Sequence, residues 1–130
     1  MLVEDIMTQK DKLITLPQVA TIREALIKMK SENVKSIIIE KSQINGAYGL
    51  ITYKNILQSI VAEDGDIDLL NIYDIANIPA LSVSRKLDIK YASKMMIQNS
   101  IKRLLVVDNN ELYGILTMSD IIDVLMEEIK

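Results

Sequence analysis

The chain contains two copies of one sequence pattern, and this internal duplication limits its possible folds more than any other feature. Residues 48–57 (YGLITYKNIL) and residues 113–122 (YGILTMSDII) share Tyr, Gly, Thr and Ile at one constant offset, and the other apolar positions stay apolar. Upstream, residues 21–33 match residues 88–100 without a gap. A repeat of this size is longer than a solenoid unit, so each copy can form a small subdomain.

Each copy is predicted to run strand, helix, strand, strand, helix. A capping-box pattern at residues 21–24 (TIRE) opens the first helix, and Asp88 is the expected N-cap in the second copy. Apolar residues at helical spacing follow each cap and predict the buried stripes of these helices. The stripes consist of Ile22, Ala25, Leu26 and Met29 in the first copy and of Ile89, Ala92, Met96 and Ile97 in the second.

The inner strands and the turns between them also follow from the pattern. Residues 37–39 and 104–107 are short apolar runs typical of buried strands. Asn45-Gly46 and Asn109-Asn110 predict tight turns before the next strand, and the last helix of each copy is expected to start after Thr52 or Thr117.

A single copy of about sixty residues has a thin core, and two copies that bury their sheets against each other remedy this. The predicted fold class is therefore α/β (α+β), with two βαββα repeats packed with pseudo-twofold symmetry through their sheets. We expect the first repeat at residues 1–62, an acidic linker at 63–73 and the second repeat at 74–130. Residues 5–8 (DIMT) resemble residues 74–77 (DIAN) and mark the two starts.

Composition removes several classes of function. The chain has no Cys and no His, which excludes disulfides, thiolate metal sites and the commonest general base. No P-loop or acid–base pair is recognisable, so we expect no catalytic residues and no metal site. The net charge of −3 argues against nucleic-acid binding. Residues 1–10 do not form a signal peptide and the apolar runs are too short to span a membrane, which favours a cytoplasmic protein.

The Gly-h-h-Thr-x-x-Asp motif (h, apolar) at Gly114, Thr117 and Asp120 resembles that of the CBS domain, the domain named after cystathionine β-synthase. Residues 101–108 (IKRLLVVD) resemble the entry to the second strand in that family, and the resemblance covers nearly the whole chain. It implies a stand-alone domain pair with no cofactor. The implied ligand is an adenosine nucleotide, AMP, ADP or ATP, or S-adenosylmethionine, held between the copies. A homodimer and an unidentified protein partner are also implied.

The resemblance also implies roles for individual residues. Asp120 would bind the ribose hydroxyls, and Thr117 and Ser119 would contact ribose or phosphate. Basic residues at the strand entry would meet the phosphate, and main-chain groups before the first strand would read the adenine. These further residues of the main site are Lys102, Arg103, Ile78, Pro79 and Ala80.

The first copy departs from the family motif. Asn55 replaces the Asp, so a ribose hydroxyl would meet no charge, and Ser36 stands where Arg103 stands in the second copy. The resemblance therefore implies one competent site and one weak or empty site. The weaker set comprises Thr52, Asn55, Lys54, Lys35 and Ser36.

Two alternatives remain open at this stage. Thr-x-x-Asp at a helix start also serves as a plain helix cap. Thr52-x-x-Asn55 is as consistent with a helix cap as with a ligand-binding site. The chain could also be an interaction module without a ligand, in which the apolar helix at residues 121–129 supplies a dimer face.

Overall fold

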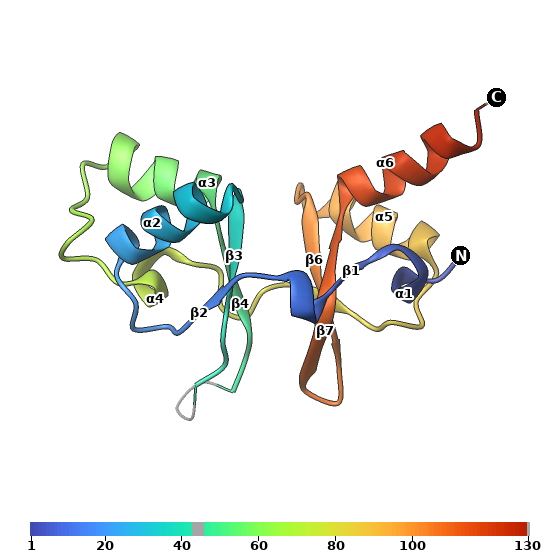
Figure 1. The fold of residues 1–130 in the computed structure, drawn as a ribbon, viewed down its shortest axis with the longest axis horizontal. Coiled ribbons are helices and arrows are strands. Elements are labelled where there is room, and N and C mark those ends of the chain that lie inside the picture. The colour runs from blue at the N-terminus through green and yellow to red at the C-terminus, as the bar shows by residue number, and fades with distance from the viewer. Residues whose placement is uncertain (43–45, 130) are drawn as a thin grey trace. The chain divides into compact units, whose positions relative to one another are not determined.

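The protein is described by a computed structural model in which residues 1–42 and 46–129 are placed. The expected order of strand, helix, strand, strand, helix is present in both copies, which confirms the mixed α/β fold class. Figure 1 shows two compact units, each with one sheet covered by helices. Unit 2 is Ile14–Ala80 and unit 1 is Met1–Leu13 with Leu81–Lys130.

Unit 2 holds a three-stranded sheet in the order β2-β3-β4. Strand β3 pairs in parallel with β2 and antiparallel with β4. Its core is aliphatic and includes Ile22, Ile37 and Ile51. The elements of unit 2 are β2 (Thr15–Leu16), α2 (Ile22–Glu32), β3 (Ser36–Ile39), β4 (Gly49–Thr52), α3 (Tyr53–Ile56), the π-helix η2 (Leu57–Ala62) and α4 (Ile72–Ile75).

Unit 1 holds a four-stranded sheet in the order β1-β7-β6-β5. Strand β6 pairs in parallel with β5 and antiparallel with β7, as in the other unit. Its core includes Met96, Leu104 and Leu116. The elements of unit 1 are α1 (Val3–Ile6), β1 (Thr8–Gln9), the 3-10 helix η1 (Lys10–Lys12), β5 (Ser82–Val83), α5 (Ile89–Gln98), β6 (Arg103–Asp108), β7 (Glu111–Thr117) and α6 (Met118–Glu127).

The compact units cut across the sequence repeats, because the opening segments are exchanged. Val3 of α1 is fully buried in unit 1, where its N–H donates to the carbonyl of Leu87 at 2.8 Å. Ile72 of α4 is fully buried in unit 2, where its N–H donates to the carbonyl of Ala20 at 2.8 Å. The acidic segment 63–73 also belongs to unit 2, where the Asp68 carboxylate accepts a hydrogen bond from Arg23 Nη2 at 2.9 Å. Each copy is thus completed by the opening segment of the other.

The local signals in the sequence give the expected local structures. Thr21 caps α2 with a full capping box, and Asp88 caps α5 by accepting the N–H of Lys90 at 2.9 Å. Asn109 and Asn110 form the two-residue hairpin between β6 and β7 with φ of 51° and 61°. This left-handed pair matches the twist of the strands. The predicted turn at Asn45-Gly46 includes a residue outside the described part of the chain.

One member of the predicted helix stripes is wrong. Ile22, Ala25 and Met29 are buried as expected, but Ile97 of α5 is 71% exposed. The stripe of α5 follows Ile89, Ala92 and Met96, and one residue further along a helix turns the side chain by about 100°. Ile97 therefore lies on the flank of α5 and not in the core.

No helix among residues 1–42 and 46–129 combines the length and the apolar character needed to cross a membrane.

Candidate functional site

The junction between β7 and α6 carries the motif residues of the second copy. Thr117 is the N-cap of α6, and its Oγ1 accepts the N–H of Asp120 at 3.1 Å. In the reciprocal hydrogen bond, Asp120 Oδ2 accepts the N–H of Thr117 at 2.9 Å. Within the described chain no protein group donates to the other oxygen, Oδ1. The pair therefore caps the helix and still leaves one acceptor available to a ligand.

Two basic residues enter β6 beside this junction. Arg103 pairs with Thr117 across the β6–β7 ladder, and the carbonyl of Lys102 accepts the N–H of Met118 at 2.9 Å. Lys102 is exposed, Arg103 is half-buried, and neither forms an ion pair with a described residue. Ser119 is exposed in the first turn of α6. Unit 1 therefore gathers Lys102, Arg103, Thr117, Ser119 and Asp120 around one strand–helix junction.

The equivalent junction of unit 2 has the same backbone and different chemistry. Thr52 caps α3, and Asn55 Oδ1 accepts both the N–H of Thr52 at 2.9 Å and its Oγ1–H at 3.1 Å. Ser36 pairs with Thr52 across the β3–β4 ladder, and the carbonyl of Lys35 accepts the N–H of Tyr53 at 3.2 Å. Lys35 and Lys54, the residue after Tyr53, are both exposed. Unit 2 thus brings together the five residues of the weaker set.

The two junctions offer a ligand opposite hydrogen-bonding groups. In unit 2 the side-chain oxygen of Asn55 is already used twice within the cap, so the group left over is its amide NH₂, a donor. In unit 1 the group left over is an oxygen of Asp120, an acceptor. The hydroxyl groups of a ribose diol can donate hydrogen bonds to a charged oxygen, so the Asp120 junction is the one that matches a ribose.

The residues predicted to read adenine belong to unit 2, whereas Asp120 belongs to unit 1. Ala80 donates its N–H to the carbonyl of Tyr48 at 3.0 Å, and Asn77 forms an isolated bridge with Leu50. The side chain of Ile78 lies so close to Gly49 that a Cβ at residue 49 would overlap it. Ile78, Pro79 and Ala80 are therefore placed along the start of β4, and unit 1 by itself does not include them.

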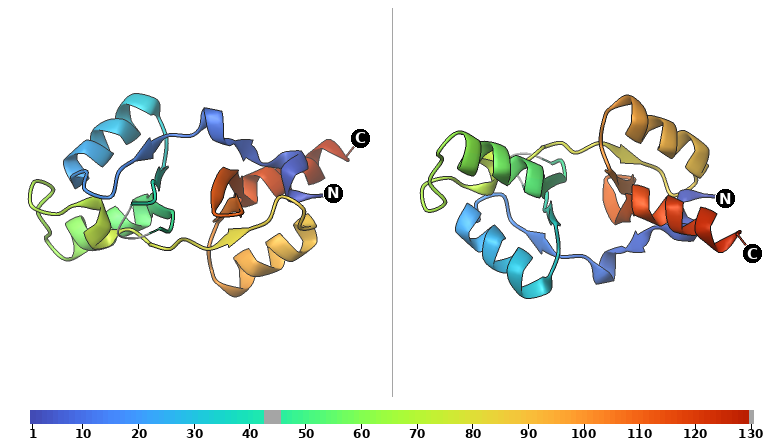
Figure 2. Two further views of the ribbon diagram at one scale, coloured as in Figure 1. Left: turned by 90° about the horizontal axis from the view of Figure 1, so that it is seen from below. Right: turned by 90° about the horizontal axis from the view of Figure 1, so that it is seen from above.

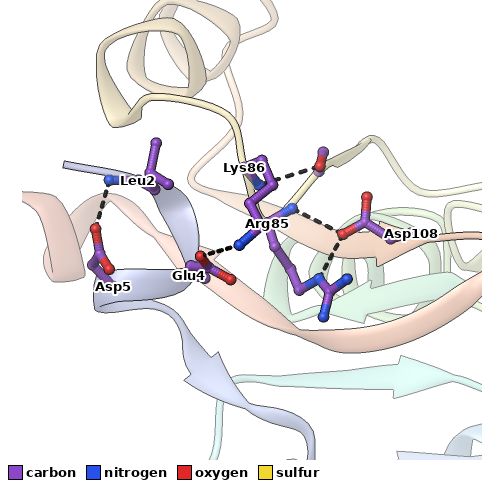
Figure 3. A network of polar contacts seen from close by, with 7 residues as sticks. Leu2, Glu4, Asp5, Arg85, Lys86 and Asp108 are labelled. Carbon is purple, nitrogen blue, oxygen red and sulfur yellow. Dashed lines mark hydrogen bonds and ion pairs between the residues drawn. The ribbon is translucent and has the colours of Figure 1, made fainter.

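The structure contains a polar network in unit 1 that was not predicted from the sequence. The guanidinium of Arg85 lies over the ring of Tyr113, 3.8 Å from its centre, and its Nε donates to Asp108 Oδ2 at 2.8 Å. Next to it, Lys86 Nζ donates to Glu4 Oε1 at 2.7 Å, which ties α1 to the loop before α5 (Figure 3). Only an Arg-Lys dipeptide after a short strand marks this network in the sequence. It borders a shallow hollow of about 960 Å³ that the N-terminal segment and β7 also line.

The network sets the ionisation of Asp108. Partial burial by itself would raise the pKa of this carboxyl, but hydrogen bonds from Ser84 and Arg85 and the positive charge of Arg85 lower it below the ordinary value of 3.8. A carboxyl whose pKa is lowered by folding stabilises the folded state above its ordinary pKa, and that stabilisation is lost as the pH falls through the lowered value.

We expect Asp108→Asn to flatten the acid dependence of stability. The variant has a lower free energy of unfolding than the wild type at pH 7, and the difference shrinks as the pH falls below about 4. Urea unfolding at pH 7, 4 and 3 measures both effects. Asp68→Asn is the matched control, because the Asp68 side chain is 57% exposed and solvent screens its pairing with Arg23. Parallel curves for the wild type and Asp108→Asn would contradict this prediction.

Comparisons with known proteins find one family. The family model described as the CBS domain matches residues 3–62 and 72–127, one match for each sequence repeat. An uncharacterized protein of Methanopyrus kandleri is 30% identical over 113 residues, which cover 86% of this chain and 57% of that protein. The chain therefore spans little more than half the length of this relative.

Solved structures show the same fold. The hexameric CBS-CP12 protein from bloom-forming cyanobacteria superimposes with a TM-score of 0.87 at 27% identity, over the whole of this chain and 75% of that one. A CBS domain protein of Pyrobaculum aerophilum, determined in complex with AMP, has a TM-score of 0.82 at 23% identity and covers 98% of this chain and 97% of its own.

Proposed function

Since this chain belongs to the CBS domain family, we propose that it is a regulatory module that binds an adenosine nucleotide in the cytoplasm and is not an enzyme. The observation that carries the proposal is the β7–α6 junction of unit 1, where the cap leaves one carboxylate oxygen of Asp120 unused and where Lys102 and Arg103 lead into the paired strand β6. The ligand is AMP, ADP or ATP, or the related S-adenosylmethionine.

The chemistry of the junction fits the two polar parts of a nucleotide. Asp120 Oδ1 accepts a hydrogen bond from a ribose hydroxyl, and a hydrogen bond to a charged acceptor is about twice as strong as a neutral one. Lys102 and Arg103 supply positive charge for a phosphate, and Arg103 offers the planar fork that binds phosphate oxygens in pairs. Of the first three N–H groups of α6, those of Met118 and Asp120 already donate to the Lys102 carbonyl and to Thr117 Oγ1, so the N–H of Ser119 is the one that adds a donor for the ligand.

Related proteins support this assignment. The Pyrobaculum aerophilum protein binds AMP on the same fold, and the cyanobacterial protein is hexameric. By analogy we propose that this chain self-associates, as a homodimer in its simplest form. Nucleotide binding then acts by population shift, because a ligand that binds one arrangement of the two copies or of two chains more tightly favours that arrangement. A partner protein that recognises the favoured arrangement reads the signal.

The junction of unit 2 is the weaker site in this proposal. Asn55 presents an uncharged donor to the ligand, and Ser36 offers no positive charge at the position that matches Arg103. Lys35 and Lys54 remain as exposed phosphate partners, and neither forms an ion pair with a residue that the structure describes. One strong site per chain is therefore expected.

A thermal-shift screen with AMP, ADP, ATP and S-adenosylmethionine tests the function. A ligand that binds only the folded state stabilises it by about 2.7 kcal/mol at a hundredfold excess over Kd, which raises the Tm by roughly 10 °C in a chain of this size. Calorimetry should then give one strong site per chain. If none of these compounds shifts the Tm at millimolar concentration, the sensor proposal fails.

The second candidate function is an interaction module that binds no nucleotide. It is favoured by exposed apolar side chains on α6, where Leu125 and Met126 are 54% and 56% exposed. A chain that associates through this helix but ignores all four nucleotides would fit this reading.

A further inference from the structure

Gly49, the first residue of β4, is buried in unit 2 and leaves a space that a neighbouring segment fills. Its backbone does not require glycine, because no glycine among the described residues has a positive φ. A Cβ at residue 49 would overlap Cγ1 of Ile78, and it would lie 3.0 Å from the carbonyl oxygen of Asn77 and 3.2 Å from Cβ of Ile39. The missing side chain therefore allows the segment after α4 to approach β4 closely.

This segment, residues 77–80, runs along the start of β4 (Figures 1 and 2). Asn77 and Leu50 exchange backbone hydrogen bonds of 3.0 Å in both directions, and the Ala80 N–H donates to the carbonyl just before β4 at 3.0 Å. The antiparallel bridge between Asn77 and Leu50 places Ile78 opposite Gly49. The half-buried Ile78 side chain covers the glycine and packs on the core of unit 2, which fixes the segment on the strand.

The pairing with β4 leaves the main chain of Ile78 unused. Asn77 and Ala80 supply the hydrogen bonds to β4, whereas the N–H and the carbonyl of Ile78 have no backbone partner among the described residues. A donor and an acceptor on one residue match in kind the edge of adenine, whose N1 accepts and whose N6 amino group donates. The position of Ile78 therefore determines where these two groups are offered to a base.

We propose that Gly49 is a positioning residue for the segment that reads adenine and so sets the preference for adenine over other bases. This inference rests on the proposed function, in which residues 78–80 read the base and Asp120 binds the ribose. A side chain at residue 49 would displace Ile78 and its two main-chain groups. The hydrogen bonds of the β7–α6 junction all lie within unit 1, so the groups that bind ribose and phosphate would keep their arrangement.

Gly49→Ala tests this role with AMP and inosine monophosphate. The two ligands share ribose and phosphate, but in hypoxanthine N1 donates and an oxygen replaces the amino group. The wild type should prefer AMP by about tenfold or more in Kd, since the unmatched edge loses its hydrogen bonds. In Gly49→Ala the preference should fall to about twofold or less, through weaker AMP binding alone. Calorimetry measures both affinities, and where ADP or ATP binds more tightly, that nucleotide and its inosine analogue form the pair.

Two further variants separate positioning from stability. Gly46→Ala is the matched control, because a Cβ at residue 46 meets nothing within 4 Å, and it should keep both the Tm and the preference for AMP. Ile78→Ala removes the atom that a methyl group at residue 49 would overlap, so adding Gly49→Ala to it should cost much less than in the wild type. If Gly49→Ala is too unstable to titrate, Ile78→Ala provides the test, since it loosens the same segment and should lower the preference severalfold.

The outcomes distinguish this inference from the function on which it rests. Equal weakening of AMP and inosine monophosphate in folded Gly49→Ala would show a structural role only and would overturn the inference, as would an unchanged preference. A wild type that binds both ligands equally would also overturn it, while the nucleotide-binding function stands. A wild type that binds none of the four compounds in the thermal-shift screen would remove the proposed function and this inference with it.

Discussion

Asp120→Ala is expected to remove about half to about 85% of the rise in Tm that an adenosine nucleotide causes at a hundredfold excess over the wild-type Kd. The substitution deletes the one carboxylate oxygen at the β7–α6 junction that the helix cap leaves unused. A hydrogen bond between a charged acceptor and a hydroxyl contributes about 1.5–3 kcal/mol, so the Kd should rise by roughly 10- to 100-fold. Calorimetry with the nucleotide identified in the thermal-shift screen measures this change directly.

The fold should survive the loss of Asp120. The deleted side chain accepts one backbone N–H, that of Thr117, and the hydroxyl of Thr117 still accepts the N–H of residue 120. Losing one half of a capping box costs about 1 kcal/mol, a small part of the stability of a domain. Loss of binding in a folded variant would therefore reflect the contact with the ligand.

Asn55→Ala is the matched control for this experiment. It removes the equivalent half of the cap in unit 2, where Asn55 Oδ1 accepts the N–H of Thr52 at 2.9 Å. The expected cost in stability is similar, and the affinity of the strong site should not change. If Asn55→Ala weakens binding as much as Asp120→Ala, or if Asp120→Ala binds normally, the assignment of the main site to unit 1 is wrong.

Val3→Asp is expected to unfold the second repeat, although Val3 is the third residue of the chain. Its side chain is fully buried in the core of unit 1, among residues of α5, β6 and β7. A carboxylate placed there without a partner should lower the free energy of unfolding by roughly 4 kcal/mol or more. Amide hydrogen exchange should therefore show lost protection in β6 and β7.

Ile72→Asp provides the mirror experiment. Ile72 occupies the equivalent place in α4, is also fully buried, and packs in the core of unit 2. Its substitution should remove protection from β3 and β4, which come before it in the chain. The exchange of opening segments would be contradicted if Val3→Asp exposed β3 and β4 while β6 and β7 kept their protection.

Much of the fold follows from signals that act over a few residues. The cap at Thr21, the apolar stripe from Ile22 to Met29 and the Asn109-Asn110 turn were all predicted correctly. These signals are reliable because helix caps and two-residue hairpins depend on contacts within the same turn of chain. The exposure of Ile97 was missed because the position of the core around a helix depends on which neighbours it meets.

For the candidate site as well, the sequence predicted the local contacts and missed the long-range ones. The motif identified the junction residues Thr117, Asp120, Thr52 and Asn55, and the hydrogen bonds between them are local to each helix start. The stacking of Arg85 on Tyr113 joins residues far apart in the chain and left no motif to find. Ile78 lies beside β4 of unit 2, a placement that depends on the segment after α4 pairing with this edge strand, where Asn77 bridges Leu50.

The sequence by itself determined the duplication, the order of elements in each copy and the difference between an acidic and an amide motif. The tertiary structure decided which copy each opening segment completes, because α1 and α4 both carry aliphatic residues and only the folded chain shows which core each one joins. It also decided which atom of each motif remains for a ligand. The sequence gives the residue type, but only the folded junctions show which side-chain atoms the caps use. The cap of α6 uses one of the two oxygens of Asp120, whereas the cap of α3 uses the only side-chain oxygen of Asn55.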